Sequence, residues 1–201
     1  MRMRWVSLVC MIWALAWAGS RVEAEEAPVS AVWHSQEIEF EYGGGSTMYS
    51  CGGLRDVVRR ILLRLGARED LRVTVFGCEV AYLPARVQIT LTSAIPANDP
   101  ELLQRLTTYD ARRLLIARVR GEKLPTASDL ERIPAVWQRI SLVSDRKLRL
   151  RPSDCDLVRQ IRRAVVPRLG VQVVSDQLNC SSVLGSVGRP RLTVDALIAA
   201  R

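Results

Sequence analysis

Apolar and polar residues follow the same order of patterns in two stretches of the chain. In the first stretch, residues 37–42, 71–76 and 86–91 alternate polar and apolar side chains, which is typical of half-buried strands. After the first of these strands, apolar residues recur every three or four positions up to Gly66, which predicts an amphipathic helix that stops at this glycine. The predicted buried stripe is Leu54, Val57, Val58, Ile61, Leu62 and Leu65.

The same order returns near the C-terminus. Three strands are predicted there, at residues 138–143, 171–174 and 191–194. Residues 147–150 either continue the first of them or form a hairpin. A helix capped by Ser153 or Asp154 follows, and Pro167 should tighten or end its last turn. Its apolar stripe is Val158, Ile161, Val165 and Leu169.

A sequence repeat with an offset of 104 residues relates the two stretches. The matched segments are Ala31-Val32-Trp33 with Ala135-Val136-Trp137, Arg64-Leu65-Gly66 with Arg168-Leu169-Gly170, Cys51 with Cys155 and, after a two-residue slip, Cys78 with Cys180. We therefore expect an α+β protein of two tandem β-α-β-β units, at residues 25–98 and 135–201. A connector over 99–134 joins them, with a helix in two pieces around Thr107-Thr108 and a linker over 121–134. One continuous sheet and two packed units are both compatible with this pattern.

The cysteine positions predict one disulfide in each unit. A helix over 52–65 rises roughly 21 Å and a strand over 71–78 covers roughly 26 Å, so a strand that returns along the helix brings Cys78 beside Cys51. The repeat then favours Cys51–Cys78 and Cys155–Cys180 over the other pairings. Each bond should contribute about 3 to 4 kcal/mol in the chain-entropy model. Wide spacing argues against a metal site, and no cofactor is expected.

Residues 1–24 have the features of a secretory signal peptide. A short basic start precedes an apolar run over 5–18, and small-residue cleavage patterns end at Ala18 and Ala24, of which we favour the second. The surroundings of Cys10 do not match a lipid-attachment motif. Removing this segment lowers the net charge from +8 to +6 and leaves four cysteines, as expected for a protein of an oxidising compartment. No later stretch is apolar over the 18 residues that a transmembrane helix requires.

Several of these segments resemble those of a group of uncharacterised secreted proteins of proteobacteria. They are Tyr49-Ser50-Cys51, Gly77-Cys78, Arg118-Val119-Arg120-Gly121, Ala135-Val136-Trp137 and Asp154-Cys155-Asp156-Leu157-Val158. The resemblance covers most of the chain after the signal peptide and implies a cell-envelope location, periplasmic or secreted, in a Gram-negative bacterium. It assigns no activity and no functional residue. The β-α-β-β order also resembles small periplasmic modules of secretion rings and envelope adaptors, in topology alone.

Residue types that occur in common catalytic sites are present, but the other residues that such sites require are missing from the sequence patterns. His34 is the single histidine, so we expect a solvent-facing or locally hydrogen-bonded side chain rather than a catalytic one. The glycines of 43–47 are followed by no lysine, so a flexible turn is favoured over a phosphate loop. Glu37, Glu39 and Glu41 share one strand face at a spacing compatible with glycoside hydrolysis, but a solvated face is favoured.

Arginines form the most prominent predicted surface feature. Candidate anion-binding residues lie opposite the apolar stripes of the two helices, at Arg55, Arg59, Arg60, Arg64, Arg159, Arg162 and Arg163. Four more arginines lie in the connector, at Arg112, Arg113, Arg118 and Arg120. Such faces bind lipopolysaccharide, other anionic polymers or an acidic protein, or are simply solvated and salt-bridged. Few aromatic residues accompany the arginines, which argues against nucleic acid.

These features favour a non-enzymatic binding or adaptor protein of the cell envelope. The alternative is a periplasmic enzyme or binder that acts on an anionic envelope polymer through the arginine-rich faces. Trp33 and Trp137 match in the repeat, and packing where each unit begins is favoured over a paired ligand site. The identity of the partner, any catalytic activity and the oligomeric state are left open by the sequence.

Overall fold

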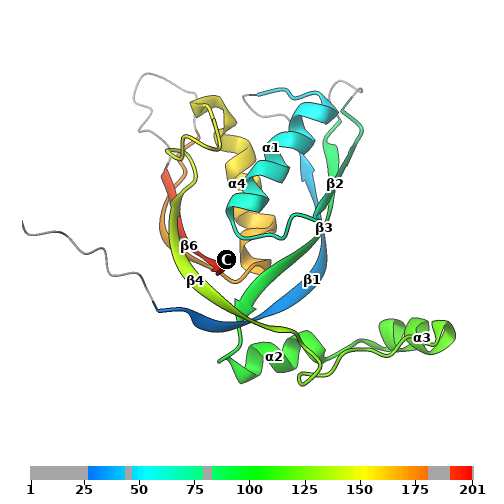
Figure 1. Ribbon diagram of the computed structural model, residues 1–201. Helices are drawn as coiled ribbons and strands as arrows, with labels where there is room; N and C mark the ends of the chain where they lie inside the picture. Colours follow the sequence, from blue (N-terminus) through cyan, green and yellow to red (C-terminus); the bar gives the residue numbers. More distant parts are fainter. Residues whose placement is uncertain (1–26, 44–46, 79–82, 181–190, 201) are drawn as a thin grey trace, which may run out of the picture.

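The computed structural model describes residues 27–43, 47–78, 83–180 and 191–200. They form a mixed fold of helices and one antiparallel sheet (Figure 1). The strands are β1 (Val29–Tyr42), β2 (Arg72–Phe76), β3 (Ala85–Pro96), β4 (Arg132–Ser141), β5 (Val171–Gln177) and β6 (Arg191–Ala199). The helices are α1 (Cys51–Arg64), α2 (Pro100–Thr107), α3 (Ala111–Arg120) and α4 (Cys155–Ala164), with 3-10 turns at Pro152–Asp154 and Val166–Arg168.

The strands pair in the order β2-β3-β1-β4-β6-β5, so both halves of the chain share one continuous sheet. The halves meet along a short antiparallel pairing of β1 with β4. At its centre Ser30 lies opposite Pro134, and Val29 lies opposite Ala135. Ser30 and Pro134 are related by the 104-residue offset, so the two halves approach each other in equivalent register. The elements run β1-α1-β2-β3 in the first half and β4-α4-β5-β6 in the second.

Helices α1 and α4 lie side by side on the concave face of the curved sheet (Figure 1). One apolar core fills the space between them and includes residues from both halves. Leu54, Val57, Ile61 and Leu65 of the first predicted stripe are buried, as are Val158, Ile161, Val165 and Leu169 of the second. Both amphipathic helices are therefore oriented as their sequence periodicity predicted.

The ends of these helices follow local sequence signals. The Ser50 side chain accepts a hydrogen bond from the Gly53 backbone N–H at 3.1 Å, which satisfies one free donor of the first turn of α1. Gly66 follows α1 with φ +90°, a conformation that favours glycine. Helix α4 ends at Ala164, and a 3-10 turn that contains Pro167 follows it, as the proline predicted.

Each glycine of the repeated Arg-Leu-Gly motif packs against the opposite half of the molecule. A Cβ on Gly66 would lie 2.6 Å from the carbonyl oxygen of Leu197 in β6. A Cβ on Gly170 would lie 2.8 Å from the carbonyl oxygen of Ala94 in β3. The Nε2 atom of Gln36 also donates to the carbonyl oxygen of Arg168 at 2.8 Å. The chain at the end of each helix segment therefore packs directly against a strand of the other half.

Several strands are longer or shorter than the segments that the alternation of polar and apolar residues predicted. Strand β1 begins at Val29 instead of residue 37. Strand β3 runs on to Pro96, and its residues 91–95 are all buried, so this segment does not alternate polar and apolar side chains. Strand β4 occupies 132–141 and takes in the end of the predicted linker. The prediction of strand or hairpin for 147–150 is wrong, since residues 146–149 form a turn.

The face of the sheet opposite the helices carries a second, smaller apolar cluster. Its buried members are Ala31, Ala94, Ala135 and Leu197. Trp33 and Trp137 are half-buried against it, one in β1 and one in β4. The Arg68 guanidinium lies over the Trp33 ring, 5.7 Å from its centroid. Both tryptophans therefore pack near the start of their halves, as expected.

The predicted signal peptide over 1–24 lies outside the described residues. Within the described part of the chain, no helix is long and apolar enough to span a membrane. The predicted connector contains α2 and α3, separated just after Thr107 as expected.

Candidate interaction surfaces

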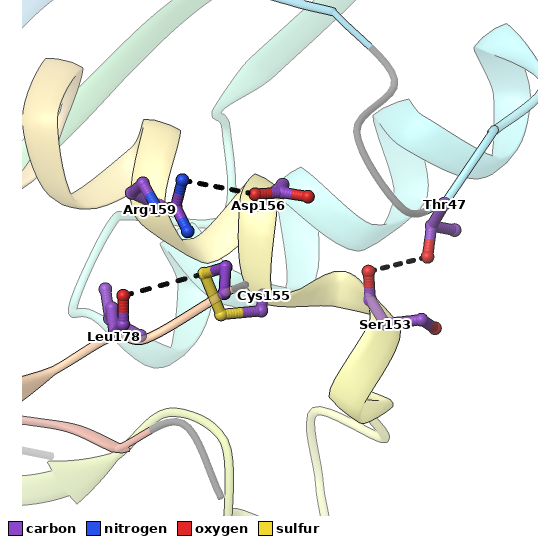
Figure 2. The surroundings of a disulfide bond; sticks show 7 residues. Thr47, Ser153, Cys155, Asp156, Arg159 and Leu178 are labelled. Atoms are coloured by element: carbon purple, nitrogen blue, oxygen red, sulfur yellow. Dashed lines mark hydrogen bonds and ion pairs between the residues drawn. A yellow bond between two sulfur atoms is a disulfide. The ribbon is translucent and has the colours of Figure 1, made fainter. Parts of the chain in front are cut away.

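The two predicted disulfides are present and support the same end of both helices. Cys51 is bonded to Cys78 and Cys155 to Cys180, with Cα–Cα distances of 5.4 and 5.5 Å. Each bond ties the first residue of a helix, α1 or α4, to the chain beyond the strand that follows it. Around the second bond, Thr47 Oγ1 donates to the Ser153 carbonyl oxygen at 2.7 Å and links the halves (Figure 2).

The predicted arginine face of α1 is partly engaged in contacts within the protein. Arg64 is not on a solvated face: its Nε lies 2.6 Å from Asp145 Oδ2, and Nη1 donates to Gln138 Oε1 at 3.0 Å. Arg55 pairs with Asp56, and Arg59 donates to the Glu69 carbonyl oxygen at 3.1 Å. Arg60 is exposed. Helix periodicity had predicted four equivalent arginines, but Gln138 of β4 and Asp145 in the turn after β4 engage the last of them.

The predicted arginine face of α4 also contains both paired and exposed arginines. Arg159 Nη1 lies 3.4 Å from Asp156 Oδ1, and Arg162 Nε lies 3.0 Å from Asp176 Oδ2 (Figure 2 shows the first pair). Arg163 is exposed. Solvent-exposed pairs of this kind contribute little to stability, but they neutralise the charge that an anionic ligand would meet.

A buried polar cluster lies at the N-terminal ends of α1 and α4. The Tyr42 hydroxyl donates to the Thr47 carbonyl oxygen at 2.6 Å, and its ring centroid lies 5.9 Å from that of Tyr49. Asp154 is 3% exposed, and its Oδ2 accepts from the Arg151 backbone N–H at 2.8 Å. Neither Oδ1 of Asp154 nor the Tyr49 hydroxyl has a hydrogen bond of ordinary geometry to a described residue. Burial, reinforced by Asp154, raises the pKa of Tyr49, and burial raises that of Tyr42 to about 12.

The other candidates from the sequence are dispersed. His34 in β1 is half-buried, and burial lowers its pKa. Glu37, Glu39 and Glu41 are exposed on the outer face of β1, as the solvated reading predicted, and Glu39 pairs with Arg86 at 3.0 Å. An open depression there is lined by Glu37, Glu39, Gln88, Thr90 and Arg168 among others. Most of the glycine-rich turn, residues 44–46, lies outside the described residues.

The segment between β3 and β4 forms an arm that leaves the sheet. We define the arm as residues 97–131, which contain α2 and α3. Helix α3 stands clear of the sheet and of α1 and α4 (Figure 1). The arm folds back on itself, because Ala117 of α3 is buried and the Tyr109 hydroxyl donates to the Pro125 carbonyl oxygen at 2.9 Å.

The outward side of α3 exposes large apolar side chains. Leu114, Leu115 and Val119 are 51%, 61% and 79% exposed. Sequence reasoning noted the arginines of this segment but treated the helix as a connector. The available signal was the presence of two leucines and a valine between those arginines.

Among the described residues, no group of three or more His, Cys, Asp or Glu side chains is placed to hold a metal ion. Comparison with protein-family models, with curated proteins and with solved structures finds no match.

Proposed function

We propose that the chain is an exported cell-envelope protein that acts as a non-enzymatic binding or adaptor module, with the arm as its docking element. The observation that carries the proposal is the exposure of Leu114, Leu115 and Val119 on a helix that stands clear of the body. Exposed apolar side chains gathered on one element, beside charged ones, are typical of interaction sites.

The disulfides support an extracytoplasmic location. Two bonds that join residues 27 and 25 positions apart are typical of proteins that mature in an oxidising compartment. The expected signal peptide over 1–24 and the resemblance to secreted proteobacterial proteins favour the same compartment. We therefore propose a periplasmic or secreted location.

We further propose that the body arose as a tandem duplication of a β-α-β-β unit. The repeated cysteines, the equal element order and the register of Ser30 opposite Pro134 support this origin. A duplicated body with one continuous sheet and interlocked helix ends is a rigid base. An arm that emerges at the junction of the halves can then present its tip in a defined direction.

The alternative is an enzyme or binder that acts on an anionic envelope polymer through the helix arginines. Arg60 and Arg163 are the members of the two faces that favour it, because both are exposed. Arg55, Arg64, Arg159 and Arg162 are paired with aspartates, which reduces the charge available on these faces. The arm is therefore the better-supported docking element.

Deletion of the arm tests the proposal. Pro96 and Arg132 lie opposite Ala31 and Val32 on the two sides of β1, so their Cα atoms are about 10 Å apart. A four-residue glycine-serine linker reaches roughly 13 Å and can replace residues 98–130 without disturbing the sheet. We expect the chain from residue 25 to sediment with isolated cell envelopes and the arm-deleted chain to stay in the supernatant.

The matched control replaces Arg60 and Arg163 by Gln, which alters the helix faces and leaves the arm intact. This variant should sediment like the parent. Equal retention of the arm-deleted chain and the parent would refute the docking role of the arm. Loss of retention in the Arg60→Gln/Arg163→Gln variant alone would favour the anionic-polymer alternative.

A further inference from the structure

We propose that α3 binds the surface of an anionic phospholipid bilayer, with its apolar side chains at the acyl boundary and its arginines on the phosphates. The proposal rests on the docking role of the arm and names the partner of that element. The segment Ala111–Arg120 combines six apolar residues with four arginines in ten positions. Basic helices that expose apolar residues are typical of membrane-surface segments.

The helix geometry separates an inner and an outer side. Ala117 is buried and marks the inner side. On the outer side Leu115 and Val119 are one turn apart, and Leu114 and Arg118 are one turn apart, so these four side chains form one exposed arc. Helix α3 lies at the far end of the arm (Figure 1), where a flat surface can meet the exposed arc without a matching groove.

The charge at this tip is unbalanced. Asp110 caps the N-terminus of α3 by accepting from the Arg113 backbone N–H at 2.7 Å, and Glu122 lies 3.7 Å from Arg113. Arg112, Arg118 and Arg120 are exposed and form no ion pair with another described residue. Three unneutralised guanidinium groups within one short helix favour a negatively charged partner.

The position of Arg118 favours a lipid surface over a protein groove. Arg118 lies within the apolar arc, four residues after Leu114 and three after Leu115. A dry protein interface over this arc would bury a guanidinium, which is costly without a partner carboxylate. At a bilayer the same side chain extends to the phosphate layer while the leucines contact the acyl boundary.

Helix α3 is already formed before binding. An isolated helix of ten residues is marginal in water. Here the Asp110 cap at one end and Gly121, in the left-handed conformation with φ +66°, at the other hold it in place. The hydrogen bond from Tyr109 to Pro125 anchors its base. Binding therefore does not include the cost of folding the helix.

Vesicle co-sedimentation tests the inference with the chain from residue 25, because the apolar run of residues 5–18 would itself partition into lipid. The vesicles are phosphatidylcholine with 25% phosphatidylglycerol, and pure phosphatidylcholine is the reference. Leu114→Ser/Leu115→Ser/Val119→Ser should weaken binding to the anionic vesicles at least about tenfold. Arg112→Gln/Arg118→Gln/Arg120→Gln should weaken it about a hundredfold, and binding should fall as salt is raised.

Arg60→Gln/Arg163→Gln is the matched charge control, and Val174→Ser on the exposed edge strand β5 is the apolar control; both should bind like the parent. Circular dichroism of each variant checks that the fold is kept. Equal binding to neutral and anionic vesicles, or equal losses in the control and α3 variants, would overturn the inference. If vesicles are not bound but envelopes retain the parent and not the arm-deleted chain, the docking role stands and the lipid inference fails.

Discussion

Alanine substitution of the two glycines at the helix ends, Gly66 and Gly170, measures how tightly the two halves pack against each other. Gly66 combines φ +90° with a close approach to the Leu197 carbonyl oxygen, whereas Gly170 has the close approach to β3 without a positive φ. Gly77 has φ +80°, but a Cβ there would meet only the Pro84 carbonyl oxygen at an ordinary 3.6 Å. Gly52 in α1 has neither feature. Alanine at these four positions therefore separates backbone strain from steric conflict.

The expected losses in the free energy of unfolding follow from the positive φ and from the close contact of the added Cβ. Gly77→Ala should cost about 1 to 2 kcal/mol, because a side chain is disfavoured in the left-handed region. Gly170→Ala should cost about 1 to 3 kcal/mol, because the backbone of β3 has to move by several tenths of an ångström. Gly66→Ala carries both effects and should cost about 2 to 5 kcal/mol. Gly52→Ala should be neutral or stabilise by up to about 1 kcal/mol, since alanine favours helix.

Urea unfolding of the oxidised chain, followed by circular dichroism, measures the four free energies. The slope of free energy against urea should be unchanged among the variants, which shows that the same surface is exposed on unfolding. A cost for Gly66→Ala no larger than that for Gly77→Ala would mean that α1 does not press against β6. The interlocked arrangement of the two halves would then be wrong.

Three further predictions concern the core, the ion pair between the halves and the buried polar cluster. Ile61→Ala should cost about 2 to 5 kcal/mol in urea unfolding and Arg60→Ala under about 0.5, and equal costs would contradict the orientation of α1. Hydrogen bonding to a guanidinium lowers the pKa of Asp145, so its stabilisation is present above the pKa of the unfolded state, about 3.9, and is lost as pH falls through the lower folded value. Asp145→Asn should therefore destabilise the protein at pH 7 and flatten the pH dependence of its stability below about pH 4. Asp70→Asn should change both quantities much less, because its pair with Arg68 is exposed to solvent. An acid profile of Asp145→Asn equal to that of the parent would refute this. Tyr49→Phe should leave the free energy of unfolding unchanged or raise it by about 1 kcal/mol, because it removes a buried hydroxyl without a good partner, and a loss would show that the hydroxyl is hydrogen-bonded in solution.

The local elements and the disulfides were predictable from the sequence. The apolar stripe that includes Ile61, the stop at Gly66 and the break at Pro167 are short-range signals that depend on helix geometry and backbone angles alone. The pairing of Cys51 with Cys78 followed from the equal reach of a helix and the strand that returns along it. The repeat extended this prediction to the second half.

Tertiary structure decided which features of the two halves meet. The sequence left one sheet and two packed units equally open, because strand partners far apart in the chain leave no local signal. The same is true of Arg64, which looks like a surface residue in its helix but reaches Asp145, 81 positions away. Only the tertiary fold brings these two groups together, so that one of the predicted anion-binding arginines forms an ion pair within the protein.

In the arm, too, the sequence predicted the helices and the tertiary structure decided which side chains are exposed. The sequence predicted a helical connector in two pieces between the halves, with frequent arginines in the second piece. Whether Leu114, Leu115 and Val119 are covered depends on where the arm travels, which local periodicity does not specify. The structure directs α3 away from the body, and exposure of these side chains follows from that path. Local chemistry thus determined the elements, and long-range packing determined which of their faces are left for a partner.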